Sequence, residues 1–304
     1  MKQVLLIPRI KIHNANALSS PYTIGFPAMS AWLGFMHNLQ RKLSTDFVDI
    51  KFNGVAVSVH EINLHTHKGD SDFNYSIISK RNPLGKGGKA PSFIEEARCD
   101  LEVSIAIECE NIDTRESDIF HKKLISILHQ SKIASGDVMS FQADRDRLKC
   151  FKIIEETDFK KFLRYLMPGF CLVARQDLMQ QAMQQGKDGI DAMLEYLKIT
   201  TEITINEKGE QSKTYSRKEK GWIVPIPLGF QGISDLSLAE DTKNSRDDQT
   251  PHRFAESVVS LGEFIMPYRF NNIEQLFWRY KPDIANNLYL YENNFIKKPQ
   301  ESKL

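Results

Sequence analysis

Residues 4–43 read VLLIPRIKIHNANALSSPYTIGFPAMSAWLGFMHNLQRKL, and this stretch sets the topology that we expect. Apolar and polar residues alternate over 10–13, which predicts a strand with one buried face. Apolar residues then recur at helical spacing over 29–43, and Pro27 precedes them, as the start of a helix allows. Pro8 has no backbone N–H to donate, so it predicts an edge position or a bulge in the strand.

The segments that follow predict three further strands and one short helix. Alternating apolar residues over 55–64 predict a strand, and a slip in their phase at His60 predicts a bulge there. Further strands are expected at 73–77 and 101–107, and PSFIEEAR at 91–98 predicts a short helix. The resulting order is β-α-β-β-α-β, the ferredoxin-like arrangement that RNA-recognition modules also use. We therefore expect an α+β fold built on a modified RNA-recognition palm.

The palm is expected to occupy residues 1–110, and two further regions follow it. Residues 111–220 are expected to form a helical insertion that ends in a polar hairpin at 201–218. Few side chains of this hairpin suit a core, so it should project as a thumb. Residues 221–304 are expected to pack on the palm and on partner subunits. Helices are predicted at 118–133, 157–167 and 175–197, the last interrupted by glycines.

Charge narrows the classes of partner. The 304-residue chain has a net charge of +1, so no overall field would attract a polyanion. The charge is uneven, because residues 1–98 contain 12 Lys and Arg against 7 Asp and Glu, whereas the rest of the chain contains 28 against 32. This division fits different partners on two sides of the molecule, and it equally fits chance scatter of surface charge.

The positions of the cysteines and the length of the apolar stretches indicate which compartment and which cofactors to expect. The four cysteines lack the C-x-x-C spacing of a zinc site, and Cys109 and Cys171 lie in apolar runs typical of buried thiols. No stretch approaches the roughly 18 apolar residues of a membrane-spanning helix. We expect a cytoplasmic, reduced protein without a metal, a cofactor or a membrane partner.

The turn between the first strand and the first helix carries neutral hydrogen-bonding side chains. Asn14 and Asn16 each present a donor and an acceptor that could pair with the edges of unstacked bases. Ser19 and Ser20 could bond phosphate or a ribose hydroxyl. The alternative is local capping, because Asn and Ser often bond their own backbone in turns. Both interpretations are open at this point.

A glycine-lysine loop, SKRNPLGKGGK at 79–89, is the second candidate site. It lacks the motif of a nucleoside-triphosphate-binding loop, because Lys89 is followed by Ala90 rather than by Ser or Thr. Its glycines would let a polyanion approach the backbone, while Arg81, Lys86 and Lys89 would supply positive charge. The alternative is a solvated hairpin loop. Because none of the strands has the aromatic pattern of a conventional RNA-recognition module, loops rather than the sheet face would hold RNA.

Histidines provide the enzymatic alternative. A metal-independent ribonuclease needs a positioned acid and base around the 2′-hydroxyl, and His13 or His37 could serve. The sequence shows no partner for either side chain. His65 and His67 fit a solvent-exposed pair better than a pair of metal ligands. We therefore expect no catalytic residues.

The segment quoted above, followed by SKRNPLGKGG and FIEEARCDLEVS, resembles the Csy-two family of type I-F CRISPR systems. Three later segments, LMPGFCLVARQDLMQQ, KGWIVPIPLGFQGIS and TPHRFAESVVSLGEF, fit that family in the same order. The match covers nearly the whole chain and is weakest over 111–160. Asn14, Ala15, Asn16 and Ala17 match the family position by position, and so do residues 81–84.

The resemblance implies a non-catalytic, Cas-five-like subunit of the CRISPR surveillance complex in antiviral defence. It implies pairing with a large Cas-eight-like subunit, contact with Cas-seven-like backbone subunits, binding of the 5′ handle of the guide crRNA, and contact with target DNA only through the complex. A ribonuclease that processes precursor guide RNA and an adaptor without RNA contact are the alternatives. Our chemical inference is that the RNA contacts come from Arg9, Lys11, His13, Asn14, Asn16, Ser19, Ser20, Arg81, Asn82, Lys86 and Lys89.

Overall fold

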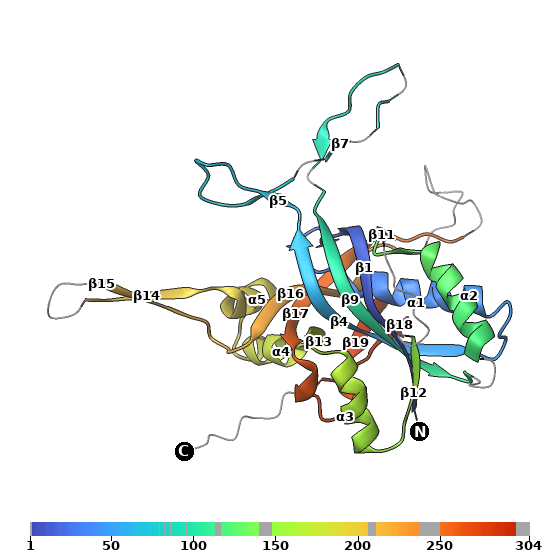
Figure 1. The fold of residues 1–304 in the computed structure, drawn as a ribbon. Coiled ribbons are helices and arrows are strands. Elements are labelled where there is room, and N and C mark those ends of the chain that lie inside the picture. Colours follow the sequence, from blue (N-terminus) through green and yellow to red (C-terminus); the bar gives the residue numbers. More distant parts are fainter. Residues whose placement is uncertain are drawn as a thin grey trace.

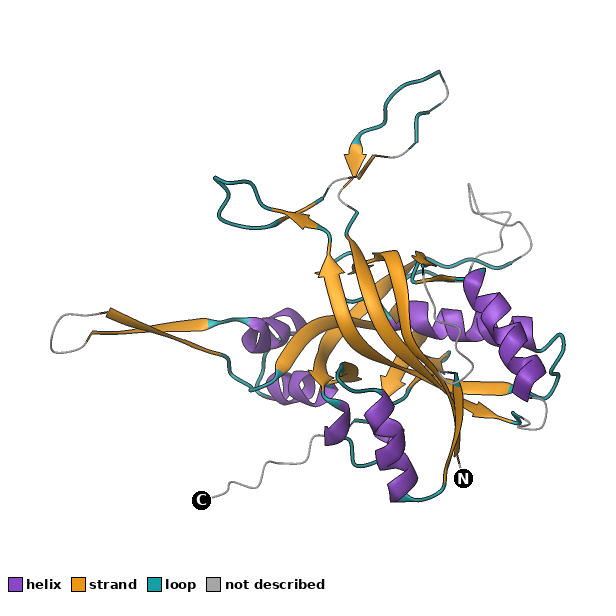
Figure 2. Cartoon of the chain, in the orientation of Figure 1, coloured by secondary structure: helices purple, strands orange, loops and turns teal. Residues whose placement is uncertain are grey.

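The computed structural model describes residues 2–78, 80–81, 83–85, 87–94, 96–112, 117–139, 148–205, 211–236 and 250–295. Within these residues the chain has an α+β fold, in which five α-helices pack around a large antiparallel sheet (Figures 1 and 2). The helices are α1 (Met29–Leu43), α2 (Ser117–His129), α3 (Glu156–Tyr165), α4 (Gln176–Gln184) and α5 (Gly189–Leu197), with short 3-10 helices η3 (Pro267–Arg269) and η4 (Ile273–Gln275).

The main sheet joins strands from all three predicted regions. In spatial order they are β10 (Lys132–Ile133), β11 (Gly136–Val138), β1 (Lys2–Asn16), β9 (Arg98–Glu110), β4 (Lys51–Leu64), β13 (Phe170–Ala174), β17 (Ala255–Ile265), β16 (Trp222–Gly232), β19 (Leu288–Asn293) and β18 (Trp278–Asp283). β12 (Lys149–Ile153) also pairs with β1. The small hairpins are β2 (Leu18–Ser20) with β3 (Thr23–Ile24), β5 (Thr66–His67) with β6 (Ser76–Ile77), β7 (Lys80–Arg81) with β8 (Phe93–Ile94), and β14 (Thr200–Ile205) with β15 (Gln211–Ser216).

Strand β1 keeps one face apolar along its length because it contains a bulge. Leu5 and Ile7 are buried before the bulge, and Ile10 and Ile12 are buried after it in the same core. The pairing of β1 with β9 shifts register between these two pairs. The bulge resets the alternation, so that all four side chains enter one core. The irregularity predicted from Pro8 is thereby confirmed.

Helices cover the two faces of the central strands unequally. On one face α1 packs over β4 and buries Trp32, Leu33 and Met36 in the main core, at the helical spacing that the sequence predicted. On the other face α3 packs through Phe162 over the half of the sheet that contains Leu6. Among the described residues, the core cluster of this second face includes no α-helix other than α3, and the remaining half of the face carries the exposed side chains of β1. We refer to it as the open face.

Strand β4 pairs on both edges and thereby closes a ring. One edge pairs with β9, and the other pairs with β13 at Val59 and Ser58 and with β18 at Val55. Because β13, β17, β16, β19 and β18 pair in that order, they form a closed ring with β4. The indole N–H of buried Trp278 donates to the carbonyl oxygen of Leu172 at 2.7 Å within this ring. Closure pairs each of these strands on both of its edges over part of its length.

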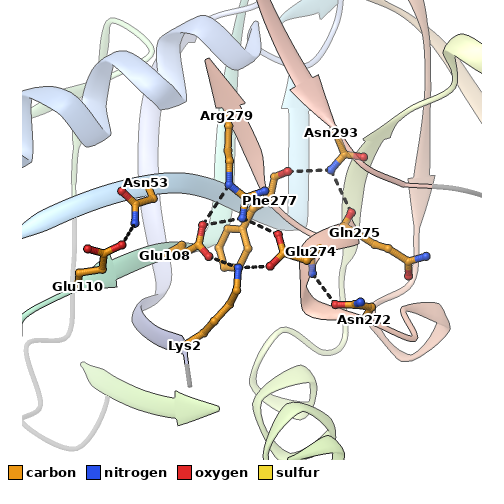
Figure 3. Close-up of polar contacts among 10 residues, drawn as sticks. All are labelled: Lys2, Asn53, Glu108, Glu110, Asn272, Glu274, Gln275, Phe277, Arg279 and Asn293. Atoms are coloured by element: carbon orange, nitrogen blue, oxygen red, sulfur yellow. Dashed lines mark hydrogen bonds and ion pairs between the residues drawn. The ribbon is translucent and has the colours of Figure 1, made fainter. Parts of the chain in front are cut away.

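An ion cluster ties the first strand to the last ones (Figure 3). The buried carboxylate of Glu108 on β9 accepts hydrogen bonds from Lys2 Nζ and from Arg279 Nη2, the latter at 2.6 Å. Glu274 in η4 binds the same two cations, with 2.9 Å to Arg279 Nη2. The guanidinium carbon of Arg279 lies 5.8 Å from the centre of the Phe277 ring. The two carboxylates and two cations neutralise one another, as a buried charge requires.

Two predicted elements of the palm are wrong. The described positions of residues 91–98 form no helix. Ala97 and Cys99 are buried in the alternating pattern of a strand, and β9 accordingly begins at Arg98. The strand predicted at 73–77 is reduced to the two residues of β6. The second helix beside the central strands is α2, which follows β9. Leaving the small hairpins and the β10–β11 pair aside, the order is β1-α1-β4-β9-α2-β12, with the strands arranged β12–β1–β9–β4.

Most elements predicted outside the palm are confirmed with shifted ends. α2 stops at His129, short of the predicted helix end, and β10 follows. The stretch predicted as a broken helix is divided into α4 and α5 near Gly186, whose φ of 87° lies in the left-handed region that favours glycine. The β14–β15 hairpin forms as predicted, its described side chains are exposed, and it projects from the body (Figure 1). The bulge predicted near His60 is confirmed by a register shift between Val59 and Glu61.

Candidate nucleic-acid interface

Pairing of the three central strands brings the candidate segments to one end of the sheet. Cys99 on β9 pairs with Ala15 of β1 on one side and with Leu64 of β4 on the other. The turn after β1, the β5–β6 hairpin after β4 and the β7–β8 hairpin before β9 therefore leave the sheet at the same end (Figure 1). We refer to this as the hairpin end. It unites the two candidate sites, which are far apart in the sequence.

Arg9 and Lys11 lie on the open face, where Glu102 of β9 binds both. Arg9 Nη1 donates to Glu102 Oε1 at 2.8 Å, and Lys11 Nζ lies 3.7 Å from Oε2. The hydrogen bond from Arg9 is the main reason why the pKa of Glu102 is lowered. Arg9 sits in the bulge with a φ of 51°, and its backbone N–H donates to Ser104 Oγ at 3.1 Å. A phosphate at this position would therefore compete with Glu102 for both cations.

Asp100 joins three segments at the hairpin end. Its carboxylate oxygens lie 2.7 Å from His13 Nδ1 on β1 and 3.0 Å from His65 Nε2, directly after β4. The same carboxylate accepts from the backbone N–H of Asn14 at 2.9 Å, where Asn14 has a φ of 59°. Burial raises the pKa of Asp100, but the bonds from Asn14 and His65 lower it on balance. His13 and Asp100 line a hollow of about 270 Å³ on the open face.

The remaining polar side chains of the turn bond the turn itself. Asn16 Oδ1 accepts from the backbone N–H of Leu18 at 3.1 Å, and its Nδ2 donates to the carbonyl oxygen of Leu18 at 3.2 Å. Ser19 Oγ and Ser20 Oγ lie 2.8 and 2.7 Å from Thr23 Oγ1. This is the local capping that the sequence left open as the alternative. These contacts give the turn a fixed shape and occupy part of its hydrogen-bonding capacity.

A hollow of about 360 Å³ lies between this turn and the first helix. Asn16 and Ser19 line it from the turn, Asn38 from α1, and Lys132 from β10. The ammonium group of Lys132 is paired with Asp137. The wall therefore offers amide, hydroxyl and backbone groups beside one neutralised cation, which suits a polar, weakly charged group.

The glycine-lysine loop forms the tip of the β7–β8 hairpin. Gly87 and Gly88 have φ values of 85° and 72°, in the region that glycine adopts most readily. The backbone N–H of Gly85 donates to the carbonyl oxygen of Lys89 at 3.1 Å, and the Lys89 side chain is exposed. Among the described residues of this compact turn, Lys89 is an exposed cation. Of the other candidates in this loop, Arg81 belongs to β7, whereas Asn82 and Lys86 lie outside the described residues.

The histidines considered for RNA cleavage contact different parts of the fold. His13 bonds Asp100, whereas His37 on α1 packs against Tyr280 of β18 with ring centres 4.8 Å apart. His65, expected to be exposed, is mostly buried because it bonds Asp100. Within the described part of the chain, no group of three His, Cys, Asp or Glu side chains is arranged to hold a metal ion. His13 and His37 do not form an acid–base pair with one another.

Two general properties of the chain follow from the described residues. Cys109 and Cys171 are buried thiols, as predicted, and burial raises the pKa of Cys171 to about 12. No helix in the described ranges combines the length and apolar composition that crossing a membrane requires.

Comparison with known proteins identifies the family. The family model described as CRISPR-associated protein (Cas_Csy2) matches residues 5–291. A protein of Pseudomonas aeruginosa (strain UCBPP-PA14), named CRISPR-associated protein Csy2, is 30% identical over 311 aligned positions that cover 94% of each chain. The chain belongs to the Csy2 family. This confirms the resemblance inferred from the sequence motifs and makes the chain a CRISPR-associated protein of the Csy2 type.

The sequence did not point to two residues that organise the site of this Csy2-family chain. Asp100 and Glu102 hold His13, Arg9 and Lys11 through the ion pairs described above, and neither was a candidate. The spacing of Asp100 and Glu102 could have identified them. Both alternate with apolar Cys99 and Leu101, so in a strand their side chains share the face opposite the core. Their partners come from a strand about 90 residues away, which no local pattern reveals.

Proposed function

We propose that the chain is a non-catalytic subunit of the type I-F CRISPR surveillance complex that binds the 5′ handle of the guide crRNA. It would join the large Cas-eight-like subunit to the Cas-seven-like backbone and so support antiviral defence. Membership in the Csy2 family supports the assignment to the complex. The observation that carries the RNA-binding role is the convergence of the turn after β1 and the β7–β8 hairpin at the hairpin end of the sheet.

The topology of the central strands supports an RNA-recognition palm. The strand order β12–β1–β9–β4, with α1 and α2 between the strands in sequence, supports a split β-α-β arrangement of the ferredoxin-like kind. In this proposal the small hairpins inserted between β4 and β9 replace the aromatic sheet face of conventional RNA-recognition modules as the RNA-binding surface.

The charges near the hairpin end indicate what kind of RNA contact is favoured. Arg9 and Lys11 share Glu102, so they add little free positive charge. Lys89 is exposed at the tip of the β7–β8 hairpin, and the part of the chain that the structure describes gives it no ion pair. A few phosphate contacts would then position the strand, while amide and backbone groups of the turn bond the bases. Weak electrostatics also fit a subunit that binds RNA together with a partner.

Handle binding by this chain with its large-subunit partner tests the proposal. We expect Lys89→Gln to lower the affinity for fluorescently labelled handle RNA and to reduce the slope of log K against log salt by about 0.7, the value for one phosphate contact on a single strand. The matched control is Lys213→Gln, which removes an exposed cation from the β14–β15 hairpin. Equal affinities and equal slopes for both variants would remove the β7–β8 hairpin from the handle site.

The joining role rests on the projecting hairpin. β14 and β15 pair over six residue pairs, yet the side chains of β15 are all exposed, so the hairpin contributes little to this chain's own core. A hairpin ordered without core contacts is suited to adding contact area on another subunit. We assign it to the neighbouring Cas-seven-like backbone subunit.

The non-catalytic assignment is tested with precursor transcript. His13 is held by Asp100 and His37 by Tyr280, and neither arrangement places an acid and a base on the two sides of one 2′-hydroxyl. We expect no cleavage at the handle boundary after incubation with the purified chain. Specific cuts that disappear in His13→Ala or His37→Ala would establish a ribonuclease instead.

A second candidate, a protein adaptor without RNA contact, is favoured by one observation. The side chains of Asn16, Ser19 and Ser20 form hydrogen bonds within their own turn, which leaves them fewer groups to bond RNA. Photocrosslinking of the assembled complex through 4-thiouridine in the handle separates the two candidates. Adducts within residues 9–20 or 80–94 support RNA binding, whereas adducts confined to the partner subunits support the adaptor.

A further inference from the structure

Two aromatic side chains stand in solvent on the β5–β6 hairpin. Phe73 is 97% exposed and Tyr75 is 72% exposed. Loop tips are normally polar, and exposed aromatic rings gathered on one short segment mark an interaction site more often than a lone exposed apolar residue does. The sequence had placed both residues in a third strand, whose alternate side chains would be buried. Their exposure therefore requires another explanation.

The hairpin that carries these rings is anchored to the body at its base, and its tip is closed by a local hydrogen bond. At the base, the backbone N–H of Ile78 donates to the carbonyl oxygen of His65 at 3.2 Å, and Ile77 packs against the core. At the tip, Asp72 accepts from the backbone N–H of Gly69 at 2.9 Å. The rings thus belong to a hairpin that is held at its base and extends from the end of the sheet (Figure 1).

One cation accompanies the rings. Lys68 Nζ lies 5.5 Å from the centre of the Tyr75 ring, within the range of a cation–π contact. Asp70 and Asp72 follow on the same segment, so its net charge does not favour a phosphate chain. Exposed rings beside a single cation suit the flat faces of unpaired bases, whose stacking does not require positive charge along the backbone.

The hairpin is connected to the candidate interface by a chain of hydrogen bonds. His65, whose carbonyl holds the hairpin base, also places its imidazole Nε2 3.0 Å from Asp100. Asp100 in turn accepts from the backbone N–H of Asn14 and pairs with His13. The rings therefore belong to a segment that is fixed directly to the turn proposed to contact the handle.

We propose that Phe73 and Tyr75 form a stacking platform for unpaired bases of the handle, with Lys68 reinforcing the Tyr75 position. This inference rests on the proposed function, because it takes the handle as the bound strand. Stacking recognises the face of a base and not its edge, so the platform holds the strand in place while the turn at 14–20 contacts base edges.

Fluorescence anisotropy with labelled handle RNA tests the platform, using the chain with its large-subunit partner. We expect Tyr75→Ala and Phe73→Ala each to weaken handle binding about tenfold, and Tyr75→Phe to retain the wild-type affinity because the ring remains. The slope of log K against log salt should not change, because no phosphate contact is lost. The control is Tyr215→Ala, which removes a ring of similar exposure, 67%, from the β14–β15 hairpin. It should leave handle binding unchanged.

A series of handles, each with one abasic position, identifies stacking specifically. At the stacked positions the abasic handle should bind the wild-type chain weakly, and Tyr75→Ala or Phe73→Ala should weaken it no further. Additive losses at every position would overturn the proposal. So would a Tyr75→Ala variant that binds the handle normally and binds the large subunit weakly, because the rings would then be a protein contact.

The two proposals fail in different ways in this experiment. If the wild-type chain binds the handle no better than a scrambled RNA, the proposed function fails and the platform fails with it. If the wild-type chain binds the handle and the Tyr75→Ala and Phe73→Ala variants bind equally well, only the platform fails. Circular dichroism of each variant verifies that the fold is retained, which the exposure of both side chains leads us to expect.

Discussion

Glu108 and Arg279 are 171 positions apart in the sequence, yet Nε and Nη2 of Arg279 both donate to Oε2 of Glu108, at 3.1 and 2.6 Å. This contact connects β9 of the central sheet with β18 of the ring (Figure 3). Lys2 adds a third donor from the start of β1, and Glu274 balances the charge from η4. The cluster therefore links the N-terminal and C-terminal strands through side chains. The pairing of β4 with β9 and with β18 links the same strands through backbone hydrogen bonds.

Glu108→Gln tests this link. The substitution keeps the shape of the side chain but leaves Lys2 and Arg279 with one carboxylate between them. We expect the free energy of unfolding to fall by about 2 kcal/mol, less than for a fully buried pair because Lys2 and Glu274 are partly exposed. Denaturant unfolding measures the change. Glu110→Gln, on the same strand and exposed, is the control, and an equal loss in both variants would contradict a special role for the cluster.

Glu102 makes the stability of the open face depend on pH. Its pKa is lowered, chiefly by the hydrogen bond from Arg9, so its contribution is present above its unfolded pKa of about 4.3 and is lost as pH falls through the lower folded value. We expect Glu102→Gln to lower the melting temperature by about 2 °C at pH 7, and the difference from wild type to shrink as the pH falls below about 4.3. Thermal unfolding between pH 3 and 7 checks this.

Glu61 is the matched comparison for Glu102. The two carboxylates pair across β4 and β9, and like charges directly opposite each other are destabilising. We therefore expect Glu61→Gln to leave the melting temperature at pH 7 unchanged or to raise it slightly. A loss in Glu61→Gln as large as that in Glu102→Gln would mean that the ion pairs with Arg9 and Lys11 are not the source of the effect.

Gly136 permits the close approach of β11 to the turn after β1. A Cβ atom there would lie 2.6 Å from Ile12 Cγ2, 2.8 Å from the carbonyl oxygen of His13 and 2.9 Å from Cα of Ala15. Because two of these atoms are backbone, Gly136→Ala must displace β1 and should cost about 2 kcal/mol of stability. Gly34→Ala on α1 meets no atom within 4 Å and should gain about 0.5–1 kcal/mol from helix propensity. Opposite shifts in chemical denaturation are expected, and shifts of the same sign would contradict the packing argument.

The β14–β15 hairpin should be removable without loss of the fold. Thr201 and Tyr215 pair directly, so an Asn-Gly turn can join them in place of residues 202–214. Since the described side chains removed are exposed, we expect the melting temperature to change by at most about 2 °C. Copurification should show loss of the Cas-seven-like subunit and retention of the large subunit. Normal assembly of the truncated chain would place the backbone contact elsewhere.

Local patterns in the sequence were sufficient for the elements with a clear period. The bulge at Pro8, the slip at His60 and the helix from Met29 were all predictable, because each changes the spacing of apolar residues along one element. The projection of the hairpin at 201–218 was predictable because few of its side chains are apolar. The helix prediction for PSFIEEAR was wrong. Its composition favours a helix, but the alternation of buried residues that begins at Ala97 belongs to strand β9.

Long-range pairing was not predictable, and it decides both the ring and the site. Pro225 and Pro227 have no backbone N–H to donate, yet β16 pairs with β17 through both, while its pairing with β19 is confined to Gly229, Phe230 and Gln231. With one edge unpaired at the prolines, a missing N–H need not break the ladder. In the candidate site, Arg9 and Lys11 pair with Glu102 on β9, so their spacing in β1 alone could not reveal that both cations share a carboxylate.

The double pairing of β4 has a mechanical consequence for any assembly that contains this chain. Rotation of the C-terminal strands against the first ones would have to break backbone bonds on an edge of β4, so the body behaves as a stiff block. Adjustment to neighbouring macromolecules is then left to three protruding arms, the hairpins β5–β6, β7–β8 and β14–β15, because most of their described side chains are exposed. Shape differences between free and assembled forms should therefore be concentrated in those arms.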